Sequence, residues 1–274
     1  GSARANNNLC ACIGESLSDS SPHTLSAARN QRYLSRKVNG DCHVTNLSGN
    51  FALVSDASSD AEYAEVMGIT SNIDKNGIAE VVMDCPPVNA LTVAEWFEVA
   101  DTVTALGRNT SVRVVVLRAE GRGFNAGVDI KEMQKTEGFE ALLGANKGCY
   151  AAFAAVYDCP VPVISAVAGF CVGGGIGLVG NSDIIIASDD AFFGLPEVDR
   201  GALGAATHLA RLVPQHKMRA MVYTSATATA GELHAFGSIL QVVPRSELRD
   251  AAMKVAQSIA DKHPTVIRAA KESL

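Results

Sequence analysis

One segment of the sequence reads Val161-Pro-Val-Ile-Ser-Ala-Val-Ala-Gly-Phe-Cys-Val-Gly-Gly-Gly-Ile-Gly177. Its first seven residues are mostly β-branched and apolar, which is typical of a strand buried on both faces of a parallel sheet. The glycines that follow let the backbone turn tightly and approach another group closely. The segment therefore predicts a buried strand, then a glycine-rich loop over 169–175, then a short helix.

The same order of elements occurs on either side of this segment. Val112–Leu117 is another continuous β-branched run, and a glycine-rich loop over 120–127 leads from it into a helical stretch that ends near Tyr157. Further strands are predicted at 183–187 and 239–243, and further helices at 246–262 and from about Pro264. Repeated strand–helix units with buried strands predict an α/β fold with largely parallel strand pairing.

Local signals fix the ends of other elements. Asn76-Gly77 lies between two apolar runs, 69–74 and 78–84, and predicts a β-hairpin with a two-residue loop. Thr92 with Glu95, and Thr229 with Glu232, are capping boxes that open helices. The first of these helices should end near Gly107 and bury an apolar face made of Trp96, Val99, Ala100, Val103 and Leu106.

The first 66 residues differ in character from the rest. They are rich in Asn and Ser and show no sustained period of 2 or 3.6. We expect residues 1–66 to form a mostly disordered extension and residues 67–274 to form the folded domain. Gly1-Ser2 resembles a cloning scar, and Met67 stands where a native start would lie. A functional leader is the alternative for this segment.

Composition excludes several classes of protein. The net charge is −6, and no basic run is longer than Arg36-Lys37, which argues against nucleic acid or an anionic membrane as a partner. Apolar stretches such as 161–167 are far shorter than the roughly 20 residues that span a bilayer, so we expect a soluble protein. The seven cysteines form no CxxC pair, which favours reduced thiols and a cytoplasmic location.

Two glycine-rich loops precede helices, at Gly121–Asp129 and at Gly169–Gly177. A helix N-terminus presents unpaired N–H groups, so two such loops side by side would give two donors for one oxygen, an oxyanion hole. The alternative is that these glycines only permit tight turns. Gly175–Gly180 also matches GxGxxG, but only two residues separate it from the next strand, which is too short for a dinucleotide-binding crossover.

Acid–base candidates are few. Glu197 follows Pro196 on a glycine-flanked loop, where it is either a solvated turn charge or a carboxylate shifted toward neutrality by Phe192, Phe193 and Leu195. The six histidines include no His-x-x-x-His pair, and His208 and His216 are better read as core or surface residues than as metal ligands. We expect no metal site.

Three segments in this order resemble the crotonase (enoyl-CoA hydratase/isomerase) superfamily: Gly123–Met133, Gly169–Gly175 and Phe193–Glu197. The resemblance covers residues 69–274. It implies a spiral of ββα turns, a CoA-thioester substrate, no separate cofactor, and a homotrimer or hexamer. It also implies an oxyanion hole made by the N–H groups of Val128 and Gly174, and a catalytic role for Glu197. Contacts to CoA are implied for Ala126, Asp129, Ile130 and Lys131.

One departure from the family narrows the activity. Its hydratases carry two glutamates, and the position of the first is Gly177 here, so simple hydration is in doubt. The segments 174–183 and 196–208 resemble CoA-thioester hydrolases that open steroid rings in sterol-degrading bacteria. A small Gly177 would leave room for a bicyclic β-diketone, Glu197 would activate water, and Asp199 and Arg200 would orient the ring ketones.

Other functions stay open from the sequence. The enzymatic alternative is an enoyl-CoA hydratase or Δ3-Δ2-enoyl-CoA isomerase, and the non-enzymatic one is an acyl-CoA binding protein. Family members usually continue with two or more further helices, whereas this sequence stops at Leu274. We therefore expect the C-terminal helical part to be truncated, and the trimer or hexamer to require it.

Overall fold

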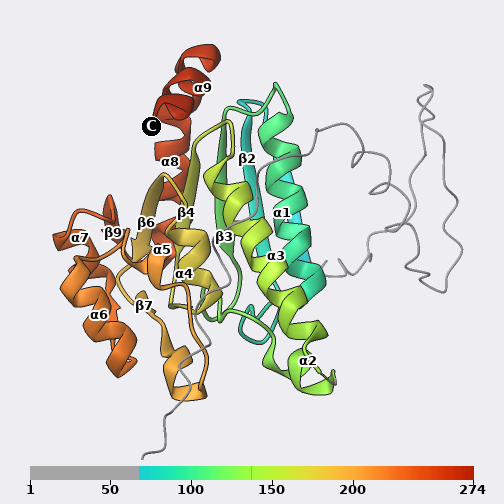
Figure 1. Ribbon diagram of the computed structural model, residues 1–274. Coiled ribbons are helices and arrows are strands. Elements are labelled where there is room, and N and C mark those ends of the chain that lie inside the picture. Colours follow the sequence, from blue (N-terminus) through green and yellow to red (C-terminus); the bar gives the residue numbers. More distant parts are fainter. Residues whose placement is uncertain (1–67, 137) are drawn as a thin grey trace, which may run out of the picture. The chain divides into compact units, whose positions relative to one another are not determined.

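The computed structural model describes residues 68–136 and 138–274, so the predictions for residues 1–66 and for Met67 lie outside the described residues. A mixed sheet forms the centre of this part of the chain (Figure 1). Its strands are paired in the order β1-β2-β3-β4-β6-β9. β1 pairs antiparallel with β2, and every following pair is parallel, which confirms the predicted pairing. The bounds are β1 Gly68–Ile73, β2 Ile78–Asp84, β3 Val114–Ala119, β4 Val163–Val167, β6 Ile184–Ser188 and β9 Gln241–Val243.

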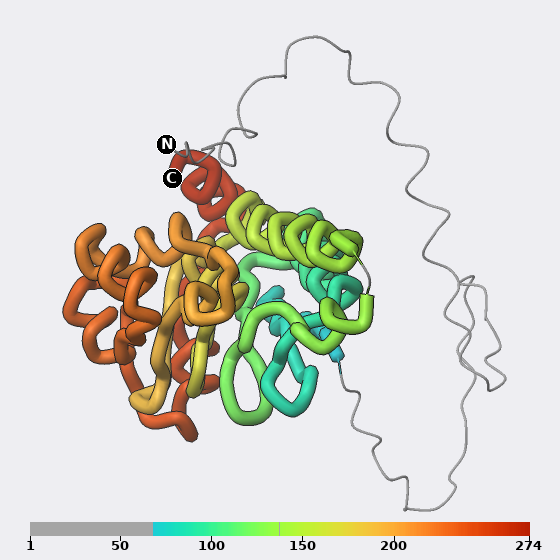
Figure 2. Tube along the Cα trace, turned by 60° about the horizontal axis from the view of Figure 1, so that its bottom comes forward, coloured from blue at the N-terminus to red at the C-terminus, as the bar shows by residue number. Residues whose placement is uncertain are grey.

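Helices cover both faces of this sheet. On one face lie α1 (Val93–Arg108) and α3 (Glu140–Tyr157), which pack along each other (Figures 1 and 2). On the other face lies α8 (Leu248–Ala260), and α9 (Pro264–Ser273) continues beyond it. Successive residues of a strand point to opposite faces of the sheet. In β3, Val115 therefore points into the core under α1 and α3, whereas Val116 points into the core under α8. This is why the strand reads as a continuous apolar run.

A second, small sheet lies within segments where the sequence analysis predicted no strand. It joins β5 (Phe170–Val172), β7 (Phe192–Gly194) and β8 (Thr227–Thr229), with β5 parallel to β7. Three-residue strands are too short for a period of two to be recognised. The remaining elements are α2 Ile130–Lys135, α4 Gly174–Val179, η1 Pro196–Arg200, α5 Ala206–Leu209, α6 Gln215–Thr224, α7 Ala230–Ala235 and η2 Arg245–Glu247.

Several local predictions are confirmed, with changes at their edges. Both capping boxes are present, and the predicted apolar face of α1 is buried. The hairpin forms, but its loop has three residues rather than two, because the Asp74 N–H bonds to the Ile78 carbonyl. Gly77 closes that loop with φ +80°, where a Cβ would lie 2.4 Å from the Ser111 carbonyl. The helical stretch up to Tyr157 is two helices, α2 and α3.

The described helices include none that is long and apolar enough to cross a membrane. Cys85, Cys149, Cys159 and Cys171 are all free thiols. Burial raises the pKa of Cys85 and of Cys149 to about 12, so at neutral pH these groups are protonated and unreactive.

Candidate active site

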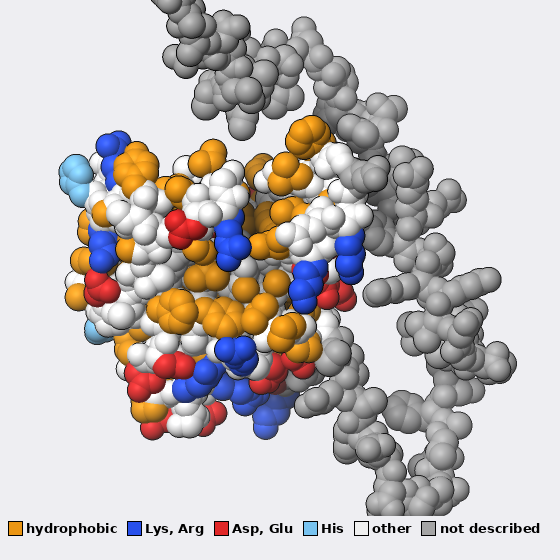
Figure 3. Space-filling model, turned by 90° about the horizontal axis from the view of Figure 1, so that it is seen from below, with side chains coloured by type: hydrophobic (Ala, Val, Ile, Leu, Met, Phe, Trp, Pro, Cys, Tyr) orange, Lys and Arg blue, Asp and Glu red, His pale blue; other side chains and the backbone are white. Residues whose placement is uncertain are grey.

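The two glycine-rich loops lie side by side at one edge of the sheet. They follow β3 and β4, which are parallel neighbours, so both loops leave from the same edge. Backbone bonds join them: the Phe124 N–H donates to the Phe170 carbonyl (2.9 Å), and the Val172 N–H donates to the Asn125 carbonyl (3.0 Å). Figure 3 shows the surface at this end of the molecule, where apolar side chains gather across the middle of the face and charged side chains surround them.

Each loop carries a backbone donor without an acceptor among residues 68–136 and 138–274. These are the N–H groups of Val128 and Gly174. The N–H just before each donor is paired: that of Gly127 donates to the Asn125 side chain (2.8 Å) and that of Gly173 to the Gly194 carbonyl (3.2 Å). Gly174 is the first residue of α4, where an N–H has no partner inside the helix.

The two donors belong to backbones in contact. A Cβ placed on Gly127 would lie 3.1 Å from the Gly174 nitrogen, and one placed on Gly174 would lie 3.4 Å from the Gly127 Cα. Gly127 (φ +87°) and Gly173 (φ +60°) also hold left-handed conformations that disfavour side chains. Glycine is therefore required here both by backbone conformation and by the close approach of the loops.

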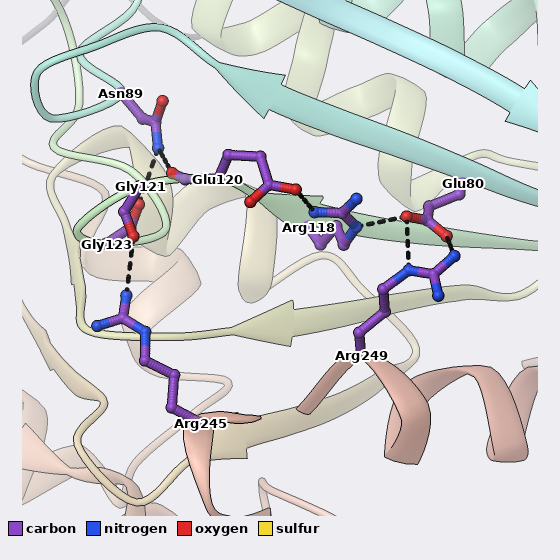
Figure 4. Close-up of polar contacts among 8 residues, drawn as sticks. All are labelled: Glu80, Asn89, Arg118, Glu120, Gly121, Gly123, Arg245 and Arg249. Carbon is purple, nitrogen blue, oxygen red and sulfur yellow. Dashed lines mark hydrogen bonds and ion pairs between the residues drawn. The ribbon is translucent and has the colours of Figure 1, made fainter. Parts of the chain in front are cut away.

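Two buried asparagines, which sequence reasoning missed, hold the first loop. The Asn89 amide nitrogen donates to the carbonyls of Glu120 and Gly123, both at 2.8 Å (Figure 4). The Asn89 amide oxygen accepts from the Cys85 N–H. The Asn125 amide nitrogen donates to the Asn89 carbonyl (2.7 Å), and the Asn125 amide oxygen accepts from the Gly127 N–H, next to Val128. Nothing in the local sequence distinguishes these asparagines from loop residues.

Arginines brace the same loop from outside. Arg245 donates to the carbonyl of Gly121 at 3.1 Å (Figure 4) and to that of Arg122 at 3.0 Å. Arg118 pairs with Glu120 and with Glu80, and Arg249 also pairs with Glu80 (2.8 Å). Burial alone would raise the pKa of Glu80, but hydrogen bonds from Arg249 and Arg118 hold it below its ordinary value. This carboxylate therefore stays charged and serves as a brace.

Glu197 lies on η1, with its carboxyl group against both glycine backbones that flank the site. A Cβ on Gly173 would lie 3.1 Å from Glu197 Oε1, and one on Gly204 would lie 2.7 Å from either carboxyl oxygen. Oε2 is buried and has no hydrogen-bond partner among the described residues. Burial raises the pKa of Glu197, against the effect of a bond from its own backbone N–H. Of the two sequence interpretations, the solvated turn charge is therefore wrong.

Aromatic rings form the floor and one wall beside the donors. Trp96 is fully buried, and its ring lies under Gly174, where a Cβ would meet it at 2.6 Å. The Trp96 and Phe153 rings meet edge to face with centroids 5.8 Å apart, and Phe153 meets His208 at 5.1 Å. Sequence reasoning placed Trp96 in the core but did not single out Phe153, which is half-buried on α3.

The expectation that Gly177 leaves room for a bulky substrate is wrong. A Cβ at Gly177 would lie 2.1–2.4 Å from three carbons of the Phe153 ring. The ring therefore fills the place that a side chain at 177 would take, and Gly177 is buried beneath it. What Gly177 accommodates is Phe153.

His208 belongs to a structural network beside this wall. The Asn181 amide nitrogen bonds to the Gly177 carbonyl (2.6 Å) and to His208 Nδ1 (2.9 Å), while Arg211 donates to the Asn181 oxygen. Because the amide nitrogen can only donate, Nδ1 is the acceptor and the ring carries its proton on Nε2. Burial, with Arg211 nearby, lowers the pKa of His208, so the ring is neutral.

The other predicted residues lie in two places, on the first glycine-rich loop with α2 and on η1. The Asp129 carboxylate caps α2 by accepting from the Lys131 N–H (2.9 Å). Ile130 and Lys131 are exposed, whereas Ala126 is half-buried. Asp199 and Arg200 are exposed on η1, and neither forms an ion pair with another residue that the structure describes.

The contact between Gly177 and Phe153 is tested by a double-mutant cycle on stability. Gly177→Ala should destabilise the protein by about 1–3 kcal/mol, because the added methyl group overpacks the ring. In a Phe153→Ala background the same change should cost clearly less, since the obstructing ring is gone. Denaturant unfolding measures both, and Gly231→Ala, where the nearest atom is 3.9 Å away, is the control. Equal costs in the two backgrounds would contradict the contact.

Comparison with known proteins shows which family and which relatives this chain resembles. Residues 74–274 match the family described as enoyl-CoA hydratase/isomerase. The chain is 66% identical over 208 residues to a (7aS)-7a-methyl-1,5-dioxo-2,3,5,6,7,7a-hexahydro-1H-indene-carboxyl-CoA hydrolase of Rhodococcus jostii, covering 76% of this chain and 81% of that protein. A protein of the same description from Mycobacterium tuberculosis is 65% identical, covering 76% and 84%. The crystal structure of an enoyl-CoA hydratase from Mycobacterium smegmatis aligns with a TM-score of 0.71 at 26% identity, covering 74% and 80%.

Proposed function

This chain belongs to the enoyl-CoA hydratase/isomerase family, and we propose that it is a hydrolase that opens a ring of a bicyclic, steroid-derived diketone CoA ester. The main support for this proposal is the set of groups at the carboxyl ends of β3 and β4. Two unpaired backbone donors stand beside one carboxyl group with a raised pKa, and Phe153 fills the place beside Gly177. The relatives' names supply the substrate class, since they combine a CoA thioester, a bicyclic skeleton and two ring ketones.

The N–H groups of Val128 and Gly174 bind the thioester carbonyl oxygen. Preorganised donors of this kind are worth about 10²–10³ in rate each, because they stabilise negative charge that develops only during the reaction. No separate cofactor takes part in this scheme, because CoA is part of the substrate. The segment from Ala126 to Lys131, which contains the Val128 donor, provides the surface along which CoA lies.

Glu197 acts as the base. Its carboxylate takes a proton from water, and the water oxygen adds to a ring ketone carbon. The bond between that carbon and an adjacent ring carbon then breaks, so the ring opens, the attacked carbon becomes a carboxylic acid, and the adjacent carbon keeps the electron pair. The electron pair moves through the conjugated system into the thioester, whose enolate oxygen is held by the two donors, and the proton from Glu197 returns to carbon. One water is added, and neither oxidation nor reduction occurs.

A single carboxyl group also suits a Δ3-Δ2-enoyl-CoA isomerase, which moves one proton and adds no water. Products followed by mass separate the two reactions. The protein is incubated with the bicyclic diketone CoA ester and, in parallel, with crotonyl-CoA and a 3-enoyl-CoA. We expect the bicycle to gain one water while the linear esters are unchanged. Conversion of the linear esters alone would assign the chain to the hydratases or isomerases.

The acidic limb of the pH profile should report Glu197. A base works only when ionised, so kcat/KM should fall as the pH drops through the Glu197 pKa, with a slope of one. Because burial raises that pKa, the fall should begin at a higher pH than for an ordinary glutamate. Melting curves over the same range show whether the protein stays folded. A flat profile down to the ordinary glutamate pKa would contradict the assignment.

The exposed face of α3 supports the association into trimers or hexamers that the family resemblance implies. Large apolar side chains line this face at Phe139, Leu143, Tyr150 and Tyr157, and each is more than half exposed. An exposed apolar patch of this kind is typical of a surface that another protein chain covers.

A further inference from the structure

The Glu197 carboxyl group sits between two glycines from separate segments. A Cβ on Gly173 would lie 3.1 Å from Oε1, which is tight, while one on Gly204 would lie 2.6 Å from Cδ and 2.7 Å from each oxygen. Real Cβ atoms essentially never come so close, so the carboxyl group occupies the space that a side chain at 204 would need. Gly204 is the closer of the two, and it contacts the whole carboxyl group.

Backbone conformation does not explain the glycine at 204. Its φ lies outside the left-handed range, unlike Gly201 (φ +69°) three residues earlier. An alanine at 204 is therefore allowed by the backbone, and the obstacle to it is the Glu197 side chain. The segment is also anchored to η1, because the Ala202 N–H donates to the Glu197 carbonyl (3.0 Å). The chain thus leaves Glu197 at its backbone and returns against its carboxyl group.

We propose that Gly204 is a positioning residue, and that its missing side chain leaves the space that holds the Glu197 carboxyl group beside the Gly174 donor. Gly173 bounds the same space from the other side. This inference rests on the proposed function in one respect, the role of Glu197 as base. The position of the carboxyl group itself is a property of the resting protein and is measured without substrate.

The resting protein gives the first test. Gly204→Ala should push the carboxyl group out of its space toward solvent, so its pKa should move down toward the ordinary glutamate value. Carbon-13 NMR of protein labelled at the glutamate carboxyl carbons follows this titration, and Glu197→Gln assigns the resonance. Gly231→Ala, on α7 with its nearest neighbour at 3.9 Å, is the matched control. An unchanged Glu197 titration in Gly204→Ala would overturn the proposal.

Kinetics with the bicyclic ester give the second test. Displacing a catalytic group by about 1 Å costs on the order of 10²-fold, so kcat of Gly204→Ala should fall by about that factor while KM changes little. Glu197→Asp withdraws the carboxyl group from Gly204, so adding Gly204→Ala to it should cost nothing further. Multiplicative losses would indicate a general structural defect at 204 and overturn the proposal.

The two tests separate a failure of the proposed function from a failure of the positioning role of Gly204. If the wild-type protein does not open the bicyclic ester, the proposed function is wrong, but the NMR comparison still decides whether Gly204 places Glu197. If the wild-type protein is active and Gly204→Ala keeps both its kcat and its Glu197 titration, the function stands and the positioning role is wrong. Thermal melting of every variant shows whether a loss comes from unfolding.

Discussion

Replacing Glu197 with Gln should lower kcat for ring opening by about 10²–10⁴-fold, the usual cost of losing a general base. The amide keeps the size of the side chain, so the contacts to Gly173 and Gly204 remain and binding of the CoA ester should be little changed. Steady-state kinetics and direct titration with the bicyclic ester measure the two effects. Full turnover by Glu197→Gln would show that another group activates the water.

The same variant should be more stable than the wild-type protein at neutral pH. Burial raises the pKa of Glu197 above its value in the unfolded chain, so the protonated form favours folding and ionisation opposes it. The associated stability is present below the unfolded-state pKa and is lost as the pH rises through the folded-state pKa. An uncharged Gln avoids that loss, so its advantage should shrink as the solution is acidified. Loss of activity with gain of stability separates a catalytic role from misfolding.

Gly127→Ala should lower kcat by about 10²–10³-fold, the typical cost of losing one oxyanion donor. The new methyl group would lie 3.1 Å from the Gly174 nitrogen, so it crowds one donor and shifts the loop that carries the other, Val128. The substitution also strains a backbone at φ +87°. Kinetics with the bicyclic ester, paired with thermal melting, separate the two consequences.

Gly121→Ala is the matched control for that strain. Gly121 lies in the same loop with φ +81°, but a Cβ there would have no heavy atom within 4 Å. It should therefore cost similar stability while leaving kcat close to that of the wild-type protein. If Gly121→Ala and Gly127→Ala lose activity equally, the loss reflects strain in the loop and the donor geometry is not responsible.

The sequence predicted the central sheet well because buried strands such as β3 and β4 carry an unmistakable apolar run. It also located the two glycine loops and Glu197, since glycine spacing and an acid beside Pro196 are local features. It did not predict Asn89, Asn125 or Gly204, whose roles come from partners that folding brings near.

Gly177 shows most clearly why part of the site could not be predicted from the sequence. A glycine in a sequence signals missing volume, but what fills that volume depends on the whole fold. Here the filling residue is Phe153 on α3, which lies 24 positions earlier and packs beside α4 through the contact of two helices. The sequence analysis also did not show that the Asp129 side chain caps α2, because that contact depends on the conformation of the side chain.

The most direct test of the proposed function is the product formed in H₂¹⁸O from the bicyclic diketone CoA ester. Hydrolytic ring opening predicts a product heavier by one molecule of labelled water, with the label in a new carboxyl group and the thioester intact. Mass spectrometry locates the label, and a thiol reagent reports any free CoA. Release of free CoA from an unopened bicycle would show simple thioester hydrolysis and contradict the account, as would a bicycle that gains no label.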